Sequence, residues 1–325
     1  MYIEAMKSFD VITLGIAVMD ILARPADRTL FDHQNTKIDD VTVATGGDAA
    51  NQAADLARLG WRVALSCRLG DDALGRLFQA EMASRGVDVS HVAVSVDSVT
   101  SAAIVLVASD GQRSIISRPG NNYDFSFADV DLDLIANARA LSIGSLYGCL
   151  KLEAEGLEAI LAHAKRHGVM TFADMSSDKN GTKLNGIRPF LPYIDWFVPS
   201  ENDSELLTDG LNVEDAAQVF LDAGAKNVVI KLGPKGAYAH CLGFKGYVPA
   251  FDIDAVDTTG SGDAFCAGLI HSLLDGNNAG DALTFACACG AFNALHLGAA
   301  TAPFSPVAIE YFIRNTPRPV RGNIT

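Results

Sequence analysis

The chain has 325 residues, of which 49% are hydrophobic and 20% charged, a composition that indicates a folded globular protein and excludes a disordered one. Its net charge of −14 would repel phosphate backbones, which argues against nucleic acid as a partner. The apolar run 11–19 is too short and too interrupted to cross a bilayer or to serve as a signal peptide, so we expect a cytoplasmic protein with no membrane partner.

Short β-rich runs alternate with helical patterns along most of the chain, which predicts an α/β fold with a mostly parallel central sheet flanked by helices. The predicted strands are Asp10–Gly15, Arg62–Cys67, Ala140–Ile143, Val169–Ala173, Trp196–Val198 and Val228–Leu232. The predicted helices are Asp48–Leu59, Asp72–Arg85 and Glu153–His167, each followed directly by a glycine.

Two stretches interrupt this alternation. Residues 21–43 lack a helical period, and residues 101–118 contain two β-rich runs on either side of Asp110-Gly111, which predicts a hairpin. We therefore expect one domain spanning residues 1–325, with these two segments inserted as a small β-rich lid over a cleft.

The most specific segment is residues 257–265, which read DTTGSGDAF and run from a glycine-rich turn into an apolar-periodic helix. Glycines and a helix N-terminus present backbone N–H groups to one point, which is the chemistry of an anion hole. Asp263 lies in the first turn of that helix. It could be an ordinary capping residue, or it could be a base that accepts the proton of an attacking hydroxyl during phosphoryl transfer.

The same segment resembles the C-terminal signature of the ribokinase-like (PfkB) carbohydrate kinase family, DTxGAGD, with Ser261 in place of the usual Ala. Residues 45–53, which read TGGDAANQA, are similar to the family's N-terminal signature GG-x-x-x-N-x-A. The two motifs occur in the family's order, and the resemblance covers essentially the whole chain. It implies a ribokinase-like fold and an ATP-dependent kinase that phosphorylates a hydroxyl of a small sugar, sugar derivative or polyol.

Carried over position by position, the resemblance implies roles for several residues. Asp263 would be the catalytic base, and the backbone amides of Gly260, Ser261, Gly262 and Asp263 would form the anion hole. The acceptor pocket would contain Asp20, Gly46, Gly47, Asp48 and Asn51. For Asp20, a solvated position at the end of a strand is the alternative.

The resemblance also implies a nucleotide side, formed by Lys231, Gly233, Gly236 and Thr258. No Walker A sequence and no GxGxxG after the first strand is present, which disfavours P-loop and dinucleotide-binding proteins. Aligned on the Leu-Leu-Thr that follows, Ser200 and Asp203 stand at the Asn and Glu positions of the family's NxxE motif, which organises Mg²⁺ through water. Asn202 and Glu205 are the literal match to that motif, and an exposed acidic helix start is the other interpretation.

Asp257, the carbonyl of Thr259 and Gly298 match positions that hold a monovalent cation in many relatives, so K⁺ is a further candidate cofactor. Val18 stands where ribokinases often carry Asn, which argues against ribose. Arg113 and Asn122 are either substrate contacts or exposed side chains.

Cys287 and Cys289 are either buried thiols packed in the hydrophobic core or, as the alternative, a metal or redox pair.

Lid strands often pair between subunits in this family, so a homodimer through the lid is expected. Three other functions stay open: a nucleoside kinase of the same family, a catalytically silent ligand-binding relative, and a nicotinamide-dependent dehydrogenase. Phe31 is the only aromatic residue in the first lid segment, and the hairpin has none. This lack of a stacking partner for a base favours a sugar over a nucleoside.

Overall fold

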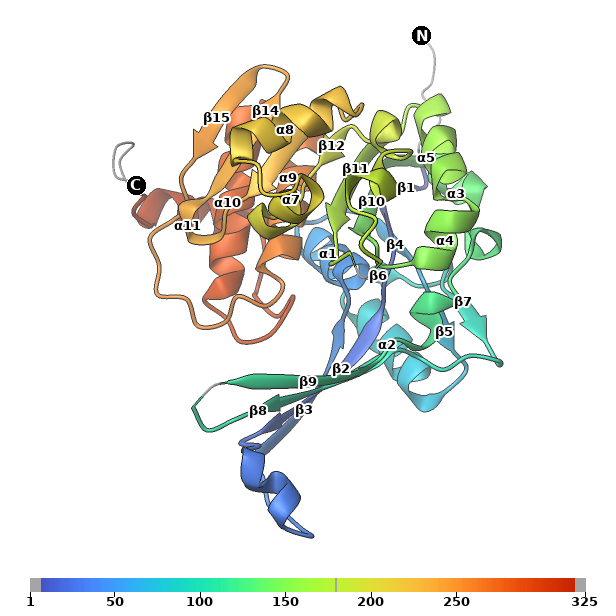
Figure 1. Ribbon diagram of the computed structural model, residues 1–325, viewed down its shortest axis with the longest axis vertical. Helices are drawn as coiled ribbons and strands as arrows, with labels where there is room; N and C mark the ends of the chain where they lie inside the picture. Colours follow the sequence, from blue (N-terminus) through green and yellow to red (C-terminus); the bar gives the residue numbers. More distant parts are fainter. Residues whose placement is uncertain (1–6, 111, 179, 319–325) are drawn as a thin grey trace.

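The computed structural model describes residues 7–110, 112–178 and 180–318, and a large nine-stranded sheet forms its centre (Figure 1). In sheet order the strands are β15 (Phe244–Val248), β14 (Ala237–Cys241), β13 (Asn227–Lys231), β12 (Trp196–Phe197), β11 (Met170–Met175), β10 (Ala138–Leu146), β1 (Phe9–Leu14), β4 (Val63–Ser66) and β6 (Val87–Asp88). In this order, the strands from β13 to β6 pair in parallel, and β14 and β15 add an antiparallel edge. This arrangement confirms the predicted α/β class.

Helices cover both faces of the large sheet and enclose two hydrophobic cores. The first core lies under α1 (Asp48–Arg58), α2 (Ala73–Ser84), α9 (Ser261–Leu274), α10 (Ala279–Ala294) and α11 (Pro306–Asn315). The second lies under α3 (Leu132–Ala136), α4 (Leu150–Glu155), α5 (Leu157–Arg166), α6 (Leu184–Ile187), α7 (Glu201–Leu207) and α8 (Val213–Asp222). Cys287 and Cys289 are free, buried thiols in the first core, so the core-packing interpretation is correct.

Alternate residues of a central strand enter different cores. In β1, Val11 packs into the first core, whereas Ile12 and Leu14 pack into the second. A parallel strand buried on both faces has an almost continuous apolar sequence, which is why these strands could be found from their apolar runs.

The predicted helix Glu153–His167 is wrong in one respect, because two helices, α4 and α5, meet at Gly156. A Cβ at this position would lie 2.3 Å from Cδ2 of Phe127. The Phe127 ring therefore packs directly against the backbone where the chain changes direction, a contact between distant residues that helical periodicity does not reveal.

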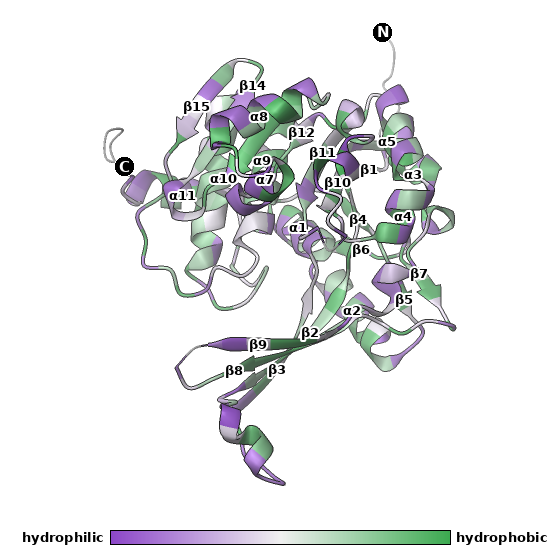
Figure 2. Cartoon of the chain, viewed as in Figure 1, coloured by the Kyte–Doolittle hydropathy of each residue, from purple (hydrophilic) through white to green (hydrophobic). Residues whose placement is uncertain are grey.

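A second sheet of four strands, called the small sheet below, projects from the large domain (Figure 1). It contains β3 (Asp40–Gly46), β2 (Val18–Arg24), β8 (Ala102–Val107) and β9 (Arg113–Arg118) in that order. Strands β8 and β9 pair as the predicted hairpin, although Gly111 of its turn lies outside the described residues. Figure 2 shows strongly hydrophobic residues along β2 and β8, the two central strands of the small sheet. Strands β5 (Arg68–Gly70) and β7 (Ala93–Ser95) form a separate pair.

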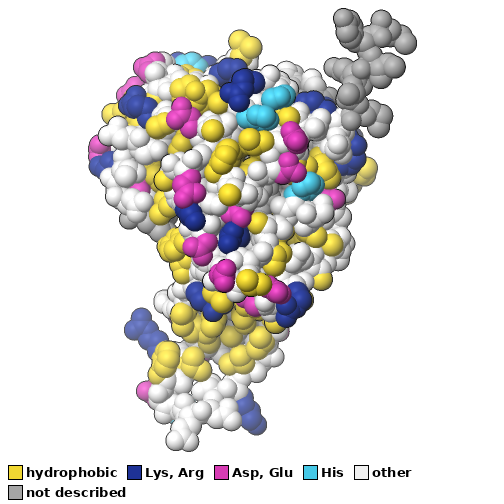
Figure 3. Space-filling view, turned by 90° about the vertical axis from the view of Figure 1, so that its right-hand side faces the viewer, with side chains coloured by type: hydrophobic (Ala, Val, Ile, Leu, Met, Phe, Trp, Pro, Cys, Tyr) yellow, Lys and Arg dark blue, Asp and Glu magenta, His cyan; other side chains and the backbone are white. Residues whose placement is uncertain are grey.

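The two faces of the small sheet differ in character. Val43, Ile21, Ile104 and Ile116 are cross-strand partners in one row, so they share a face, and Figure 3 shows hydrophobic side chains gathered in this lower part of the molecule. Asp20 pairs with Ala44 and Ala103 and therefore lies on the opposite face.

No helix within the described ranges is both long and apolar enough to span a bilayer.

Candidate active site

The glycine-rich turn opens directly into α9, with Gly260 in the left-handed conformation at φ +73° just before the helix. A Cβ on Gly260 would lie 2.9 Å from Cα of Ala299, so only glycine fits this close approach. The amides of Gly262 and Asp263 fall in the first turn of the helix, where N–H groups have no intrahelical acceptor. Local geometry thus provides the donors that an anion requires.

Asp263 is buried and its carboxylate faces α1. Asn51 Nδ2 donates to Asp263 Oδ2 at 2.9 Å, and Gln52 Nε2 donates to Asp263 Oδ1 at 3.4 Å. Gln52 is itself held by Ser142 Oγ, which donates to its Oε1 at 2.7 Å. No side chain caps the start of α9, so the capping interpretation of Asp263 is wrong. The two sequence motifs meet here although 212 positions separate Asn51 from Asp263.

The environment of Asp263 makes it a stronger base than an ordinary aspartate. Burial raises the pKa of Asp263 well above its usual value, and the nearby Asp48 carboxylate raises it further, against the hydrogen bond from Asn51. Burial also raises the pKa of Asp48 to about 6, despite its hydrogen bond from Ser145 Oγ. Two carboxyl groups therefore share one buried region, where full ionisation of both is costly.

Lys231 is the cation that faces these carboxylates. It is the last residue of β13, and its Nζ forms an ion pair with Asp174 Oδ2 at 2.5 Å. A Cβ on Gly262 would lie 3.4 Å from the same Nζ, so the ammonium borders the glycine-rich turn. Burial alone would lower the pKa of Lys231, but the charges of Asp174 and Asp263 and the hydrogen bond to Asp174 raise it, and the group stays charged.

Sequence reasoning missed Asp174, a buried carboxylate at the end of β11. Besides Lys231, Asp174 Oδ2 accepts from Cys266 Sγ at 3.3 Å. The available signal was its position directly after the predicted strand Val169–Ala173, because ligands of open α/β sheets bind at the carboxyl ends of the strands.

The predicted acceptor residues lie where β2 and β3 of the small sheet reach α1. A Cβ on Gly46 would lie 2.2 Å from Asp20 Oδ2, and one on Gly47 would lie 2.6 Å from the carbonyl oxygen of Ile16. Asp20 lies within β2 rather than at its end and is only partly exposed, which contradicts its interpretation as a solvated strand-end residue, and burial raises the pKa of its carboxyl group to about 6. Within the described residues, the Asp20 side chain has no hydrogen-bond or ion-pair partner.

The predicted nucleotide-side residues have different surroundings. Gly233 has φ +56° and open space around its Cα, whereas a Cβ on Gly236 would lie 2.0 Å from the carbonyl oxygen of Val248. The need for glycine at 236 is therefore explained by packing against the end of β15. Thr258 is exposed, and its carbonyl accepts from Ser261 N at 3.1 Å.

Ser200 and Asp203 form a capping box at the start of α7. Ser200 Oγ and Ser200 N donate to Asp203 Oδ2 at 2.5 and 3.0 Å. Asp203 is nevertheless close enough to Asp48 to raise the pKa of that group. The literal alternatives, Asn202 and Glu205, are exposed. Across the described ranges, no cluster of three or more His, Cys, Asp or Glu side chains could enclose a metal ion.

The Asp257 carboxylate, one of the groups predicted for a monovalent cation, is bound by donors of the protein itself. Asp257 accepts from Thr259 N at 2.9 Å and from Gly298 N at 2.9 Å, and it forms an ion pair with Arg113 at 2.9 Å. The interpretation of Asn122 as an exposed side chain is wrong. Its buried amide bonds to the backbone of Ala17, as donor at 3.1 Å and as acceptor at 3.2 Å.

Two arginines support the loop that packs against Gly260. Arg58 Nη1 and Arg85 Nη1 donate to the carbonyl of Ala300 at 2.5 and 3.4 Å. Arg58 also pairs with Asp55, whose side chain is fully buried in α1. Helices α1 and α2 thereby hold the loop that fixes the position of the glycine-rich turn.

We expect Asp55→Asn to change how stability depends on pH. Burial raises the pKa of Asp55 to about 7, against the charges of Arg58 and Arg85. A carboxyl group with a folded pKa above its unfolded value near 3.9 stabilises fully below that value and loses this contribution as pH rises through 7. The fall in unfolding free energy between pH 5 and pH 8 should therefore be smaller in the variant by about 3 kcal/mol. Urea unfolding at both pH values measures this. Asp222→Asn, at an exposed site in α8, is the control, and an unchanged fall in Asp55→Asn would contradict the prediction.

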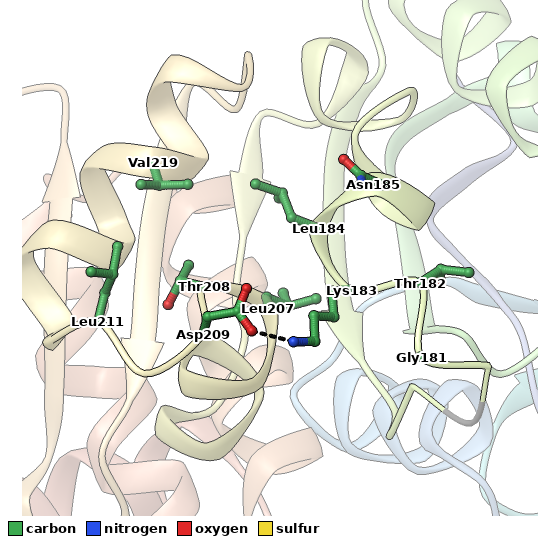
Figure 4. A pocket seen from close by; sticks show the side chains of 10 residues that line it. All are labelled: Gly181, Thr182, Lys183, Leu184, Asn185, Leu207, Thr208, Asp209, Leu211 and Val219. Carbon is green, nitrogen blue, oxygen red and sulfur yellow. Dashed lines mark hydrogen bonds and ion pairs between the residues drawn. The ribbon is translucent and has the colours of Figure 1, made fainter.

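A cavity of about 370 Å³ opens away from this site, between the segment before α6 and the helices α7 and α8 (Figure 4). Lys183 and Asp209, which form an ion pair, face each other across it. None of the predicted site residues lines this cavity. The candidate active site is therefore the arrangement around Asp263 and Lys231, not this cavity.

Comparison with known proteins places this geometry in a family. The chain matches the pfkB family carbohydrate kinase description over residues 8–306. It is 30% identical to the ribokinase of Haemophilus influenzae over 79% of this chain and 83% of that one, and 32% identical to fructokinase-1 of Oryza sativa subsp. japonica over 82% and 87%. A provisionally assigned ribokinase II from Escherichia coli, in complex with ATP and Mg²⁺, has a TM-score of 0.83 at 25% identity over 94% of this chain and 99% of that one. The chain therefore belongs to the pfkB family of carbohydrate kinases and is a sugar kinase with a ribokinase-like fold.

Proposed function

We propose that this sugar kinase transfers the γ-phosphoryl group of ATP to a hydroxyl of a small sugar, sugar derivative or polyol, with Asp263 as the base. The observation that carries the proposal is the position of Asp263. It is buried, oriented by Asn51 and Gln52, and located in the helix turn whose amides border the Lys231 ammonium. An acceptor hydroxyl beside Asp263 would face a phosphate bound at the turn.

In this mechanism, the γ-phosphate binds the amides of Gly260, Gly262 and Asp263 and the ammonium of Lys231, whereas the amide of Ser261 donates to the carbonyl of Thr258. Asp263 accepts the proton of the acceptor hydroxyl as its oxygen attacks the phosphorus in line with the leaving ADP. The turn and Lys231 stabilise the charge on the transferring group, because these donors are already oriented before the reaction. Gly233, Gly236 and Thr258 border the rest of the nucleotide.

The Asp203 carboxylate, with the Asp48 carboxylate nearby, suits a hard cation that also binds phosphate oxygens. Mg²⁺ commonly uses one or two carboxylates together with substrate phosphates and waters, so the absence of a complete side-chain cage within the described residues agrees with this role. When bound, Mg²⁺ would neutralise negative charge on the phosphates. Ser200 would act only by holding Asp203 in its orientation.

The acceptor site in this proposal lies between Asp20 and α1, under the small sheet acting as a lid formed by segments 21–43 and 101–118. Asp20 is partly buried, lacks a partner among the described residues, and faces the close approach at Gly46, so its carboxylate is free to accept hydrogen bonds from sugar hydroxyls. Asp48 and Asn51 would supply further polar contacts. Phe31 is 84% exposed, so it offers no enclosed stacking surface for a nucleoside base.

The hydrophobic row on the other face of the small sheet suits a second copy of this chain. Ile104 and Ile116 are 40% and 57% exposed, and with Ile21 and Val43 they cross all four strands. A two-fold axis would place the same row of each copy against the other. Light scattering should give twice the monomer mass, and Ile116→Asp should give the monomer. Ile115→Asp, on the opposite face, should remain dimeric, and a monomeric parent protein would reject the dimer.

The test of the proposed function is ATP consumption in the presence of Mg²⁺ with a panel of sugars, sugar alcohols, sugar acids and nucleosides. Turnover that depends on a sugar or polyol supports the proposal, and turnover with nucleosides alone identifies a nucleoside kinase instead. Binding of ATP without turnover on any acceptor would favour a silent ligand-binding relative.

A further inference from the structure

Arg113, at the start of β9, connects the small sheet to the loop before α9. Its Nη2 lies 2.9 Å from Asp257 Oδ1, and its Nη1 donates to Thr259 Oγ1 at 2.6 Å. The Asp257 side chain is only 3% exposed, whereas the arginine side chain is 39% exposed. One residue of the small sheet therefore supplies a positive charge to a buried carboxylate beside the glycine-rich turn.

The oxygens of Asp257 and the carbonyl oxygen of Thr259 also accept hydrogen bonds from other donors of the protein. Asp257 Oδ1 accepts from Thr259 N and Thr259 Oγ1 at 2.9 and 2.7 Å, and Asp257 Oδ2 accepts from Gly298 N at 2.9 Å. Asn293 Nδ2 donates to the carbonyl of Thr259 at 2.8 Å. A metal cation needs several oxygens that replace its hydration shell. Among the described residues in and beside this loop, the buried side-chain oxygens without a hydrogen-bond partner are Asn293 Oδ1 and Ser261 Oγ, which are too few to replace a hydration shell.

The charge state of Asp257 fits a permanent pair with Arg113. Burial alone would raise the pKa of Asp257, but hydrogen bonds from Thr259, Gly298 and Arg113 lower it to about 2. The carboxylate is thus ionised at any working pH. A second cation at this position would be repelled by the guanidinium.

We propose that Arg113 takes the place of a monovalent cation at this loop, so that the protein orients its glycine-rich turn without K⁺ and only while the small sheet covers the site. This inference rests on the proposed function. Arg113 is a positioning residue, because it acts through Asp257 and Thr259 on the turn that follows them. Movement of the small sheet away from the large domain would remove the cation that pairs with the Asp257 carboxylate, which couples closure of the sheet to the order of the turn.

Two measurements test the inference, each with K⁺ compared with tetramethylammonium at equal ionic strength. In the first, kcat and the KM for ATP are measured for the parent protein, Arg113→Ala, Arg113→Lys and the control Arg24→Ala, which removes an exposed arginine of the same sheet. The parent should have equal activity in both salts. Arg113→Ala should lose about tenfold or more in kcat/KM for ATP, Arg113→Lys should keep part of it, and Arg24→Ala should match the parent.

The second measurement is the melting temperature, which needs no turnover and so separates this inference from the proposed function. K⁺ should not raise the melting temperature of the parent relative to tetramethylammonium. Arg113→Ala and Asp257→Asn should each lower it, and their effects should not add in the double variant, because both remove the same ion pair. A K⁺-specific rise in activity or melting temperature of the parent, full activity of Arg113→Ala, or additive effects would each overturn the inference.

Discussion

Replacement of Asp263 by asparagine should lower kcat by a factor of about 10²–10⁴, the usual contribution of a positioned general base. Asparagine keeps the size of the side chain but cannot accept the hydroxyl proton. The amides of the glycine-rich turn and Lys231 are unchanged, so the dissociation constant for ATP should stay within about threefold, a change of less than about 1 kcal/mol. Release of ADP in a coupled assay measures kcat, and calorimetric titration measures ATP binding.

The control is Asp275→Asn, which makes the same substitution at the exposed C-terminal end of the same helix and should retain parent activity. The pH profile gives a second readout. Because the pKa of Asp263 is raised, kcat/KM of the parent should increase with pH as this group loses its proton, and that step should be missing in Asp263→Asn. Unimpaired turnover of Asp263→Asn would reject its assignment as the base.

The strands of the large sheet could be predicted because the signal for each strand lies in its own residues. Parallel strands with both faces buried have apolar sequences that end at polar or turn residues, and β1, β4 and β13 lie within one or two residues of the predicted bounds. The break at Gly156 could not be predicted, because Phe127, the side chain that packs against the backbone there, comes from a distant part of the chain.

The same division between local and distant contacts applies to the site. Glycine spacing and a following helix indicated the turn around Asp263, and the second motif indicated Asn51. Neither indicated that these two side chains bond to each other, which depends on how α1 packs against α9. Asp174 belongs to no motif, and its ion pair with Lys231 joins the ends of two different strands, 57 positions apart.

That ion pair predicts the largest effect on stability. Replacement of Lys231 by methionine, which has a similar length and no charge, should lower the unfolding free energy by about 3–5 kcal/mol at pH 8, because it leaves the buried Asp174 carboxylate without its cation. The loss should be smaller at pH 5, where Asp174, whose pKa is already raised by burial, takes up a proton more readily. Urea unfolding followed by tryptophan fluorescence measures both values.

The double variant Lys231→Met/Asp174→Asn separates stability from function. Without the unpaired carboxylate it should recover most of the lost unfolding free energy, yet it should not recover turnover, because no ammonium then borders the turn at Gly262. Lys235→Met is the control: its exposed ion pair with Glu201 should contribute less than about 1 kcal/mol. If Lys231→Met unfolds at the same urea concentration as the parent protein, Lys231 is not the charge that stabilises Asp174. If the double variant turns over ATP at the parent rate, the ammonium has no part in phosphoryl transfer, and the amides of the turn suffice.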